Sequence, residues 1–230
     1  MKIFVFDDGV GIFATLCKLK YSVAADYTAY ILDEQFPLGE KSPSQLSAIA
    51  ADCCKKAFSL GAEGVVLSSA ALSCCSRGGE NVFRCDPPVV HASAYTASKV
   101  LVCGETAAVN AAGRFAGVIP LPMPRFPLLA EQGASRSDVA GYVSQCAEPL
   151  CGAFDCIALA GSSLSLYKSC FCSVFPNLHV FDSLDGVTRR IRKKYKKCVN
   201  DESTVQLVSQ SGADVSQKYR FFMEELLNAY

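Results

Sequence analysis

The sequence predicts an α/β fold with two parallel β-sheets. Apolar stretches of strand length alternate with amphipathic stretches of helix length, and they do so in two consecutive series along the 230 residues. Two of the apolar stretches, 64–68 and 156–160, run into small residues, as strands of a parallel sheet do where they open onto a site. Half of the residues are hydrophobic and 19% are charged, so the chain can bury a substantial core.

The first series begins with a strand that ends in two aspartates. In chain order we expect a strand at 2–6, a helix at 11–19, a helix at 43–60 and strands at 64–68 and 89–91. The helix at 43–60 follows Ser42 and Pro43, a pair typical of a helix start.

The second series begins near residue 99. In chain order it predicts a strand at 99–103, a helix from 106, a strand at 115–119, helices between 125 and 150, and strands at 156–160 and 179–181. A helix from 185, a strand at 204–208 and a helix at 213–227 follow. Because the strands end in Asp-Gly, Ser-Ser and Gly-Ser, we expect the polar edges of the two sheets to face a shared cleft.

Charge and hydropathy limit the classes of partner. Lysine plus arginine and aspartate plus glutamate number 22 each, so no overall field attracts nucleic acid or an anionic membrane. Asp7 and Asp8 precede any apolar stretch of signal-peptide length, and the most apolar later stretch, 156–175, is interrupted by Lys168 and by serines. We therefore expect a cytoplasmic protein with no membrane partner.

Thirteen cysteines are scattered through the chain. No pair has the C-x-x-C spacing of a zinc or redox site, and only His91 and His179 could complete a ligand set. We therefore expect no metal site, and reduced thiols that act as small core hydrophobes.

Two motifs in the first series resemble the cofactor-independent glutamate racemases. The segment 6–11, FDDGVG, is similar to the FDSGVGG opening of that family, and 36–43, FPLGEKSP, is similar to its FPYGEKSP loop. The segment 118–131, which ends in LPMPRFPLLAE, is similar to the family's LPCPxLVPLIE, and 180–183, VFDS, to its IDS strand. The resemblance spans nearly the whole chain.

This resemblance implies two pseudo-symmetric α/β domains with the active site in the cleft between them. Here the first domain would comprise residues 1–94 plus 186–230, and the second, inserted domain residues 95–185. The family activity it implies is amino-acid racemisation without a cofactor, as in the supply of D-glutamate for peptidoglycan. It also implies a small-molecule ligand in the cleft and allows a homodimer.

The family's two catalytic cysteines have no counterpart in this sequence. The family motif ACNTAS aligns with 68–73 and puts Ser69 at the first thiol position, and GCTHYP aligns with 160–165 and puts Gly161 at the second, with Ser163 at another lost catalytic position. Racemisation requires an acid–base group on each face of the substrate. A serine hydroxyl is a far weaker acid than a thiol, and glycine has no side chain. We therefore expect a degenerate active site, a pseudoenzyme that does not racemise glutamate.

The family's polar anchors are also replaced. Ala70 and Ala71 stand for an asparagine and a threonine, and Leu38 for a tyrosine. Asp8 stands for a serine, and its carboxylate would repel an anionic substrate. The resemblance places the substrate-binding positions at Asp8, Pro37, Leu38, Gly39, Ala70, Ala71, Cys103, Thr106 and Ser162.

Some functional positions are retained. Asp7 and Glu131 match the carboxylates that assist the two cysteines, so both remain candidate catalytic residues. The alternative is that Asp7 caps the following helix and that Glu131 is solvated. Cys103, at a predicted strand end, is either a thiol in the cleft or an incidental small residue.

Three functions remain open. The first is a racemase-like scaffold that binds a small molecule or a protein, and the second is a surviving or altered enzyme built on Asp7, Glu131, Ser69 and Cys103. The third is a regulatory interaction protein. A basic run at 189–197 with seven cations is typical of a solvated helix; we do not expect it to bind nucleic acid, because neither an aromatic platform nor a reading motif accompanies it in the sequence.

Overall fold

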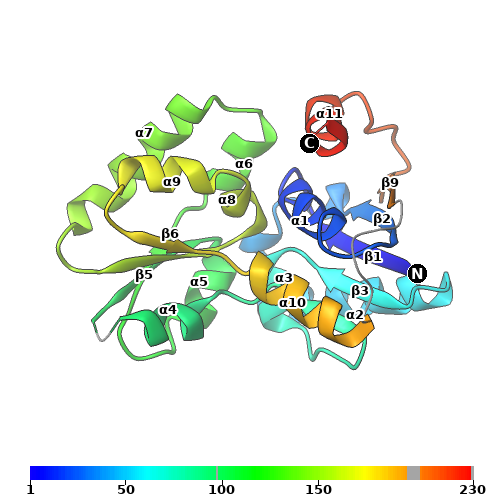
Figure 1. The fold of residues 1–230 in the computed structure, drawn as a ribbon, viewed down its shortest axis with the longest axis horizontal. Helices are drawn as coiled ribbons and strands as arrows, with labels where there is room; N and C mark the ends of the chain where they lie inside the picture. Colours follow the sequence, from blue (N-terminus) through cyan, green and yellow to red (C-terminus); the bar gives the residue numbers. More distant parts are fainter. Residues whose placement is uncertain (97, 196–202, 229–230) are drawn as a thin grey trace.

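The chain forms two parallel β-sheets that lie side by side (Figure 1). The computed structural model describes residues 1–96, 98–195 and 203–228. The first sheet has the strand order β4-β3-β1-β2-β9 and the second the order β6-β5-β7-β8, and neighbouring strands in both run parallel. The predicted fold class, two α/β domains with parallel sheets, is therefore confirmed.

The first sheet collects strands from both ends of the chain. Its strands are β1 (Lys2–Asp7), β2 (Asp26–Ile31), β3 (Gly64–Leu67), β4 (Val82–Arg84) and β9 (Thr204–Ser209). The helices on this side are α1 (Ile12–Lys20), α2 (Pro43–Ser59), α3 (Ala70–Cys75), α10 (Leu184–Tyr195) and α11 (Arg220–Asn228), with short 3-10 turns η1 (Asp33–Gln35) and η2 (Leu38–Glu40). The helix α11 packs beside α1, so the end of the chain returns to the first domain (Figure 1).

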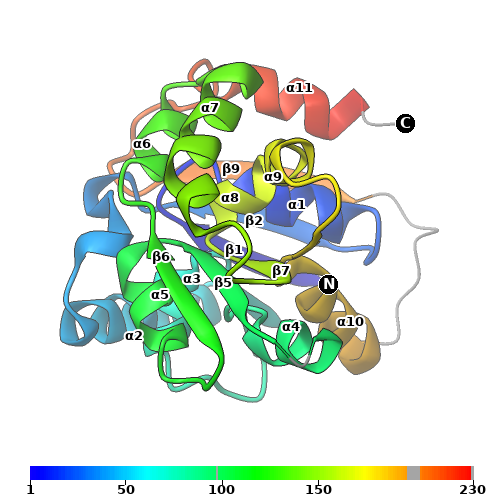
Figure 2. The same ribbon diagram turned by 90° about the vertical axis from the view of Figure 1, so that its left-hand side faces the viewer.

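The second sheet is formed by the middle of the chain. Its strands are β5 (Val100–Gly104), β6 (Val118–Pro122), β7 (Cys156–Ala160) and β8 (His179–Phe181). The helices are α4 (Val89–Tyr95), α5 (Thr106–Ala112), α6 (Phe126–Glu131), α7 (Arg136–Ala147), α8 (Ser162–Leu166) and α9 (Lys168–Val174), with the 3-10 turn η3 (Glu148–Leu150). The helices α4 and α5 lie on one side of this sheet and α6 to α9 on the other (Figures 1 and 2). The predicted domain boundaries, at 94–95 and 185–186, stay a prediction.

The strand β1 shows why these residues form a buried parallel strand. Ile3 and Val5 pack in the core under α1, whereas Phe4 and Phe6 pack in a second core under α2. Both faces are covered, so the strand is apolar throughout rather than alternating, as parallel sheets require. The helix α2 begins where the sequence predicts, since Ser42 Oγ accepts a hydrogen bond from the Gln45 backbone N–H and the Gln45 side chain accepts one from Ser42 N–H.

Two strands were not predicted. In β2 the segment DYTAYI shows neither clean alternation nor a continuous apolar run, yet five of its six residues are buried because the strand lies between β1 and β9. The strand β4 has only three residues, which are too few to show the alternation of apolar and polar side chains that predicts a strand. Both strands depend on neighbours that are distant in sequence.

Three predicted elements differ from the structure. The predicted strand 89–91 is wrong: these residues begin α4, in which Val89 and Ala92 pack into the core against β5 and β7. The strand predicted at 115–119 begins only at Val118, because Phe115 closes a turn on Ala112 and Gly117 adopts a positive φ of 76°. The last helix starts at Arg220, not at 213.

The carboxyl ends of four strands meet at the junction between the two sheets. The residues that follow β1 and β3 come from the first domain, and those that follow β5 and β7 come from the second. In the first sheet, Ser68 Oγ, which follows β3, donates a hydrogen bond to Asp7 Oδ2 at the end of β1 (2.5 Å). In the second sheet, the Glu105 N–H, which follows β5, donates one to the Ala160 carbonyl at the end of β7 (3.2 Å). Among the described residues, no helix is long and apolar enough to cross a membrane.

Candidate functional site

Three carboxyl groups lie buried where the two domains meet. Asp7 and Asp8 follow the end of β1, and Glu105 follows the end of β5. Their exposed fractions are 1%, 9% and 5%, respectively. We call these three residues the acidic cluster.

Asp7 is held by hydrogen bonds from both domains. Its Oδ2 accepts from Ser68 Oγ at 2.5 Å and its Oδ1 from the Asp8 backbone N–H at 3.0 Å. Ser162 of the second domain adds a side-chain hydrogen bond that, like that of Ser68, lowers the pKa of Asp7. The helix α1 begins at Ile12 with no side-chain cap, so the alternative in which Asp7 caps this helix is wrong.

Asp8 binds the loop that carries the FPLGEKSP motif. Its Oδ2 accepts a hydrogen bond from the Leu38 backbone N–H at 2.6 Å. The side chain of Leu38 is fully buried in the apolar core of the first domain. The Asp8 carboxyl group therefore holds this loop against the end of β1.

Glu105 projects into the junction between the domains. A Cβ atom on Gly39 of the first domain would lie 2.8 Å from Glu105 Cβ, and one on Gly161 would lie 3.2 Å from Glu105 Oε1. The carboxyl group therefore occupies space beside Gly161, the position at which the resemblance places the second thiol. Its Oε2 atom is buried without a hydrogen-bond partner.

The acidic cluster favours protonated carboxyls. Burial, followed by the negative charge of Asp8, raises the pKa of Asp7 well above its usual range. Burial, followed by the charges of Asp8 and Asp7, does the same for Glu105, and burial also raises the pKa of Asp8. No recorded salt bridge of the described residues involves these three groups, so each retained negative charge is costly.

Three glycines let the two domains approach closely. A Cβ on Gly11 would lie 2.2 Å from Ser162 Oγ, one on Gly9 would lie 2.4 Å from Glu131 Oε2, and one on Gly39 would meet Glu105 as described above. Each pair joins the first domain to the second. We had expected the polar edges of the two sheets to face a shared cleft; at these three points the side chains of the second domain reach across to the backbone of the first.

Glu131 connects the second domain to two parts of the first. Its Oε2 accepts from the Val10 backbone N–H at 2.8 Å, and its Oε1 forms an ion pair with Lys218 at 2.5 Å and accepts a hydrogen bond from the Tyr219 hydroxyl. The side chain is only 11% exposed, so the alternative of a solvated Glu131 is wrong. Glu131 acts here as an interdomain tether.

Ser69 and Gly161, the positions that the resemblance aligns with the family's thiols, lie at the starts of two helices. Ser69 is fully buried, and its Oγ accepts a hydrogen bond from the Leu72 N–H at 3.4 Å as the N-cap of α3. Gly161 precedes α8 and offers only backbone. Ser163 is also buried, and its Oγ has no partner.

The other predicted positions divide into two groups. Leu38, Gly39, Ser162 and Thr106 lie at the junction, Thr106 as the first residue of α5 directly after Glu105, and Pro37 precedes the loop that Asp8 holds. Ala70 and Ala71 are almost fully buried in two separate apolar cores. They therefore line packed interior rather than an open cleft.

Cys103 is not a thiol at the site. It is fully buried in the apolar core of the second domain, and burial together with Cys146 raises its pKa. The alternation of side chains along β5 explains this placement, because Cys103 points into the core that contains Leu101. The structure thus favours the incidental small residue.

Sequence reasoning missed Glu105. The signal was available: it is a carboxylate directly after an apolar strand, the same pattern that singled out Asp7. Among the described residues, no group of three or more His, Cys, Asp or Glu side chains is arranged to hold a metal ion. The acidic cluster can therefore bind a cation through hydrogen bonds or transfer protons, but it offers no thiolate.

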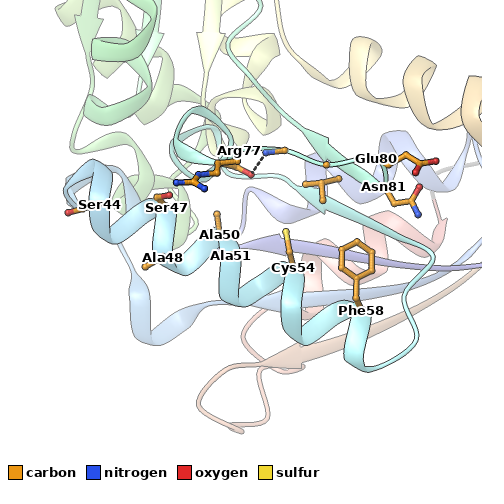
Figure 3. A pocket seen from close by; sticks show the side chains of 14 residues that line it. Ser44, Ser47, Ala48, Ala50, Ala51, Cys54, Phe58, Arg77, Glu80 and Asn81 are labelled. Atoms are coloured by element: carbon orange, nitrogen blue, oxygen red, sulfur yellow. Dashed lines mark hydrogen bonds between the residues drawn. The ribbon is translucent and has the colours of Figure 1, made fainter.

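A cavity of about 870 Å³ lies away from the junction, between α2 and the loop before β4 (Figure 3). Small side chains of α2, such as Ala48 and Ala51, line one wall, with Arg77 and Asn81 opposite. None of the site residues predicted from the sequence lines this cavity.

The structure was compared with known proteins. No protein-family model and no curated protein matches the sequence. Among solved structures, it is similar to the glutamate racemase from Thermus thermophilus in complex with β-chloro-D-alanine, with a TM-score of 0.82, 18% identity and coverage of 99% of this chain and 93% of the other.

Two further glutamate racemases show the same likeness. The one from Campylobacter jejuni has a TM-score of 0.81 and 14% identity, with 100% of both chains covered. The one from Escherichia coli, in complex with L-glutamate and the activator UDP-MurNAc-Ala, has a TM-score of 0.77 and 16% identity, with 98% of this chain and 94% of the other covered. The chain therefore has the fold of the glutamate racemases.

Proposed function

We propose that the protein is a small-molecule-binding protein on the glutamate racemase scaffold that does not racemise amino acids, and that its ligand carries a cationic group such as an amine. The observation that carries this proposal is the acidic cluster: three buried carboxyls, one of them with an unpartnered oxygen. Ionisable groups buried without countercharge are costly and concentrate at functional sites, whereas a purely structural junction gains nothing from them.

The loss of racemisation follows from the two thiol positions. The Ser69 hydroxyl caps α3 by accepting a hydrogen bond from the Leu72 N–H, and Gly161 has no side chain. Two described thiols lie within electrostatic range of the acidic cluster, Cys85 of Asp7 and Cys74 of Glu105, but burial raises the pKa of each to about 12, so both stay protonated. Cys103 faces the core. The required pair of proton-transferring thiols is therefore missing.

The preference for a cation follows from charge. Burial is the main cause of the raised pKa of Asp8 and of Glu105, so an amine placed between them would supply the opposite charge that favours their ionised forms, and it would hydrogen-bond Glu105 Oε2. An acidic amino acid would add carboxylates to a site that already has three. Like charges a few ångströms apart in such a buried place cost on the order of several kcal/mol.

Ligand entry requires the two domains to separate. The glycine contacts and the Glu131 tether close the junction in this structure. Solved neighbours of the same fold hold β-chloro-D-alanine or L-glutamate, which supports the use of this scaffold for small ligands. Opening breaks the hydrogen bonds of Glu131 and Ser162 and separates α1 from α8 and α3 from α5.

A thermal-shift screen tests the proposal. Small amines and amino-acid amides should raise the melting temperature of the parent protein, whereas L-glutamate, D-glutamate and other dicarboxylates should not. The shift should shrink in Asp8→Asn and Glu105→Gln, because each change removes one of the charges that bind the amine.

The matched control is Asp52→Asn, which removes an exposed carboxylate on α2 far from the junction and should keep the full shift. Equal shifts in all four proteins would place amine binding elsewhere on the surface. Stabilisation by glutamate that persists in Asp8→Asn would show that the carboxylate does not select against the family's substrate. Either result contradicts the proposal.

A second candidate function is an acid–base enzyme in which Glu105 replaces the second thiol. The specific observation is the placement of Glu105 Oε1, 3.2 Å from the position of a Cβ on Gly161, together with its raised pKa. A carboxyl group with a raised pKa can donate and accept protons near neutral pH. Catalysed proton exchange that Glu105→Gln abolishes would favour this candidate.

A further inference from the structure

A second, unrelated site lies on the outer surface near the start of α10. There residues of α4, β8 and α10 line a surface cavity of about 440 Å³. The helices α4 and α10 lie side by side in Figure 2. Three aromatic rings form its wall: His179 lies 5.0 Å from Tyr95 and 4.4 Å from Phe181, measured between ring centroids. We call these three residues the aromatic platform.

The aromatic platform is open to solvent. Tyr95 is 60% exposed, which is unusual for a large ring that already packs against two others. Both histidines of the chain lie here, because His91 also lines the cavity. A flat ring can therefore stack on Tyr95 or His179 without any change in the core.

The helix α10 presents a cationic face next to the platform. Arg189 lines the cavity, and Arg192 and Lys193 follow at spacings of three and four residues, which places all three on one side of the helix. All three are exposed, and among the described residues none forms a salt bridge. We call these three residues the cationic face. The hydrogen bond from Lys18 is the main cause that lowers the pKa of Asp185, and the charge of Arg189 adds to it.

The nearby acidic groups do not cancel this charge. Asp182 pairs with Lys168 at 2.7 Å and Asp185 pairs with Lys18 at 2.6 Å. Because each aspartate already has its own cation, the cationic face keeps a net positive charge. The basic run continues in the sequence beyond α10, with Lys196 and Lys197, which lie outside the described residues.

We propose that the aromatic platform and the cationic face together bind single-stranded nucleic acid, with one base stacked on Tyr95 and His179 and the backbone phosphates along α10. Aromatic rings beside a positively charged track are the two components of such binding, because every base has a face that can stack. The sequence run alone lacked an aromatic platform; the fold supplies one from α4 and β8.

A single strand fits better than a duplex. The bases of a duplex are stacked on one another and unavailable to an exposed tyrosine, whereas an unpaired base can lie on its ring. An acidic peptide would satisfy the cationic face but would leave the platform unused. The platform is therefore the feature that selects the partner.

Fluorescence anisotropy with a labelled 12-nucleotide RNA of mixed sequence tests this proposal at low salt. Tyr95→Ala should weaken binding at least about fivefold, the effect of losing one stacked base, and should leave the salt dependence unchanged. Arg192→Glu should also weaken binding, but it should make the salt dependence shallower. For the parent protein, three phosphate contacts predict a slope of log K against log salt of about −2.

The chain offers a matched control in Arg114 and Phe115, an exposed cation beside an exposed ring on the loop before β6. The double variant Arg114→Glu, Phe115→Ala should bind the RNA like the parent protein, whereas Tyr95→Ala, Arg192→Glu should lose binding. Because Tyr95 is largely exposed and contacts only the rings of His179 and Phe181 in the aromatic platform, its replacement should lower the melting temperature by a few degrees at most and leave the protein folded, which separates lost binding from lost fold.

Three outcomes would overturn the proposal. The first is equal binding by the two double variants, and the second is binding of a duplex as tightly as the single strand with no dependence on Tyr95. The third is competition by adenosine monophosphate at the strand's own affinity, which would show that the site takes a free nucleotide. None of these outcomes depends on the ligand of the acidic cluster.

Discussion

Replacing Glu105 with glutamine is expected to raise the free energy of unfolding at pH 8 by about 1–3 kcal/mol, although the change removes a charge from the most polar part of the molecule. Glu105 is 5% exposed, has an unpartnered Oε2 and lies near two further carboxyls. Glutamine keeps the shape of the side chain and an oxygen that can accept the hydrogen bond from the Ala71 backbone. The destabilising charge disappears without leaving a cavity.

The pH dependence of this effect follows from the direction of the pKa shift. Burial raises the pKa of Glu105 above its value in the unfolded chain, so its contribution to stability is complete below about pH 4 and is lost as the pH rises through the raised pKa. Burial raises the pKa of Asp7 and of Asp8 as well, so their contributions to stability are also lost as the pH rises. The parent protein should therefore lose stability as the pH rises above the unfolded-state values of about 4, and Glu105→Gln should lose less.

Urea unfolding at pH 5 and pH 8 measures both quantities. Burial also raises the pKa of Asp86. Because Asp86 changes the stability with pH equally in the parent and in the variant, the difference between the two proteins reports on Glu105 alone. Asp52→Asn, on the exposed face of α2, serves as the neutralised control and should match the parent at both pH values. A Glu105→Gln protein that is less stable than the parent at pH 8 would show that this carboxylate has a partner which stabilises it.

Gly11→Ala is expected to destabilise the protein by about 1–3 kcal/mol, a fall of several degrees in melting temperature. The backbone of Gly11 has an ordinary helical φ of −56°, so alanine causes no strain of its own. Its Cβ, however, would lie 2.2 Å from Ser162 Oγ and 2.6 Å from the Ser163 backbone nitrogen. One methyl group should thus force the two domains apart.

The control for this change is Gly141→Ala in α7. No atom lies within 4 Å of a Cβ at Gly141, and the residue is exposed, so alanine should stabilise the helix by up to about 1 kcal/mol. The melting temperatures of Gly11→Ala and Gly141→Ala, each compared with that of the parent protein, test this prediction. If Gly11→Ala melts no lower than the parent protein, the domains do not press together at Ser162 and the junction is more open than described above.

The fold was largely predictable because its central strands are locally encoded. The strands β1, β3, β5 and β7 each combine a short apolar run with a small or acidic residue at the end. The helix α2 begins directly after the Ser42 cap, with Pro43 as its first residue. The elements that were missed or misassigned depend on distant neighbours. The segment Val89–Tyr95 has a β-branched start, yet it forms a helix because its buried side pairs with the second sheet.

The site was predictable in its residues but not in its packing. The sequence identified Asp7, Asp8 and Glu131, and the structure brings the first two together with Ser68 and Ser162. Whether strand ends face an open cleft or a closed junction depends on how far the domains approach, and no local pattern encodes that distance. The aromatic platform was invisible for the same reason, since Tyr95 and His179 are far apart in the sequence.

Solvent-deuterium exchange at the α-carbon of L- and D-glutamate is the most direct test of the central claim that the scaffold has lost the family's chemistry. With the purified protein in D2O, we expect no exchange above the rate of buffer alone, because Ser69 caps a helix and Gly161 offers no acid–base group. Catalysed exchange that Ser69→Ala or Glu105→Gln abolishes would contradict it, since proton transfer would then take place at the closed junction.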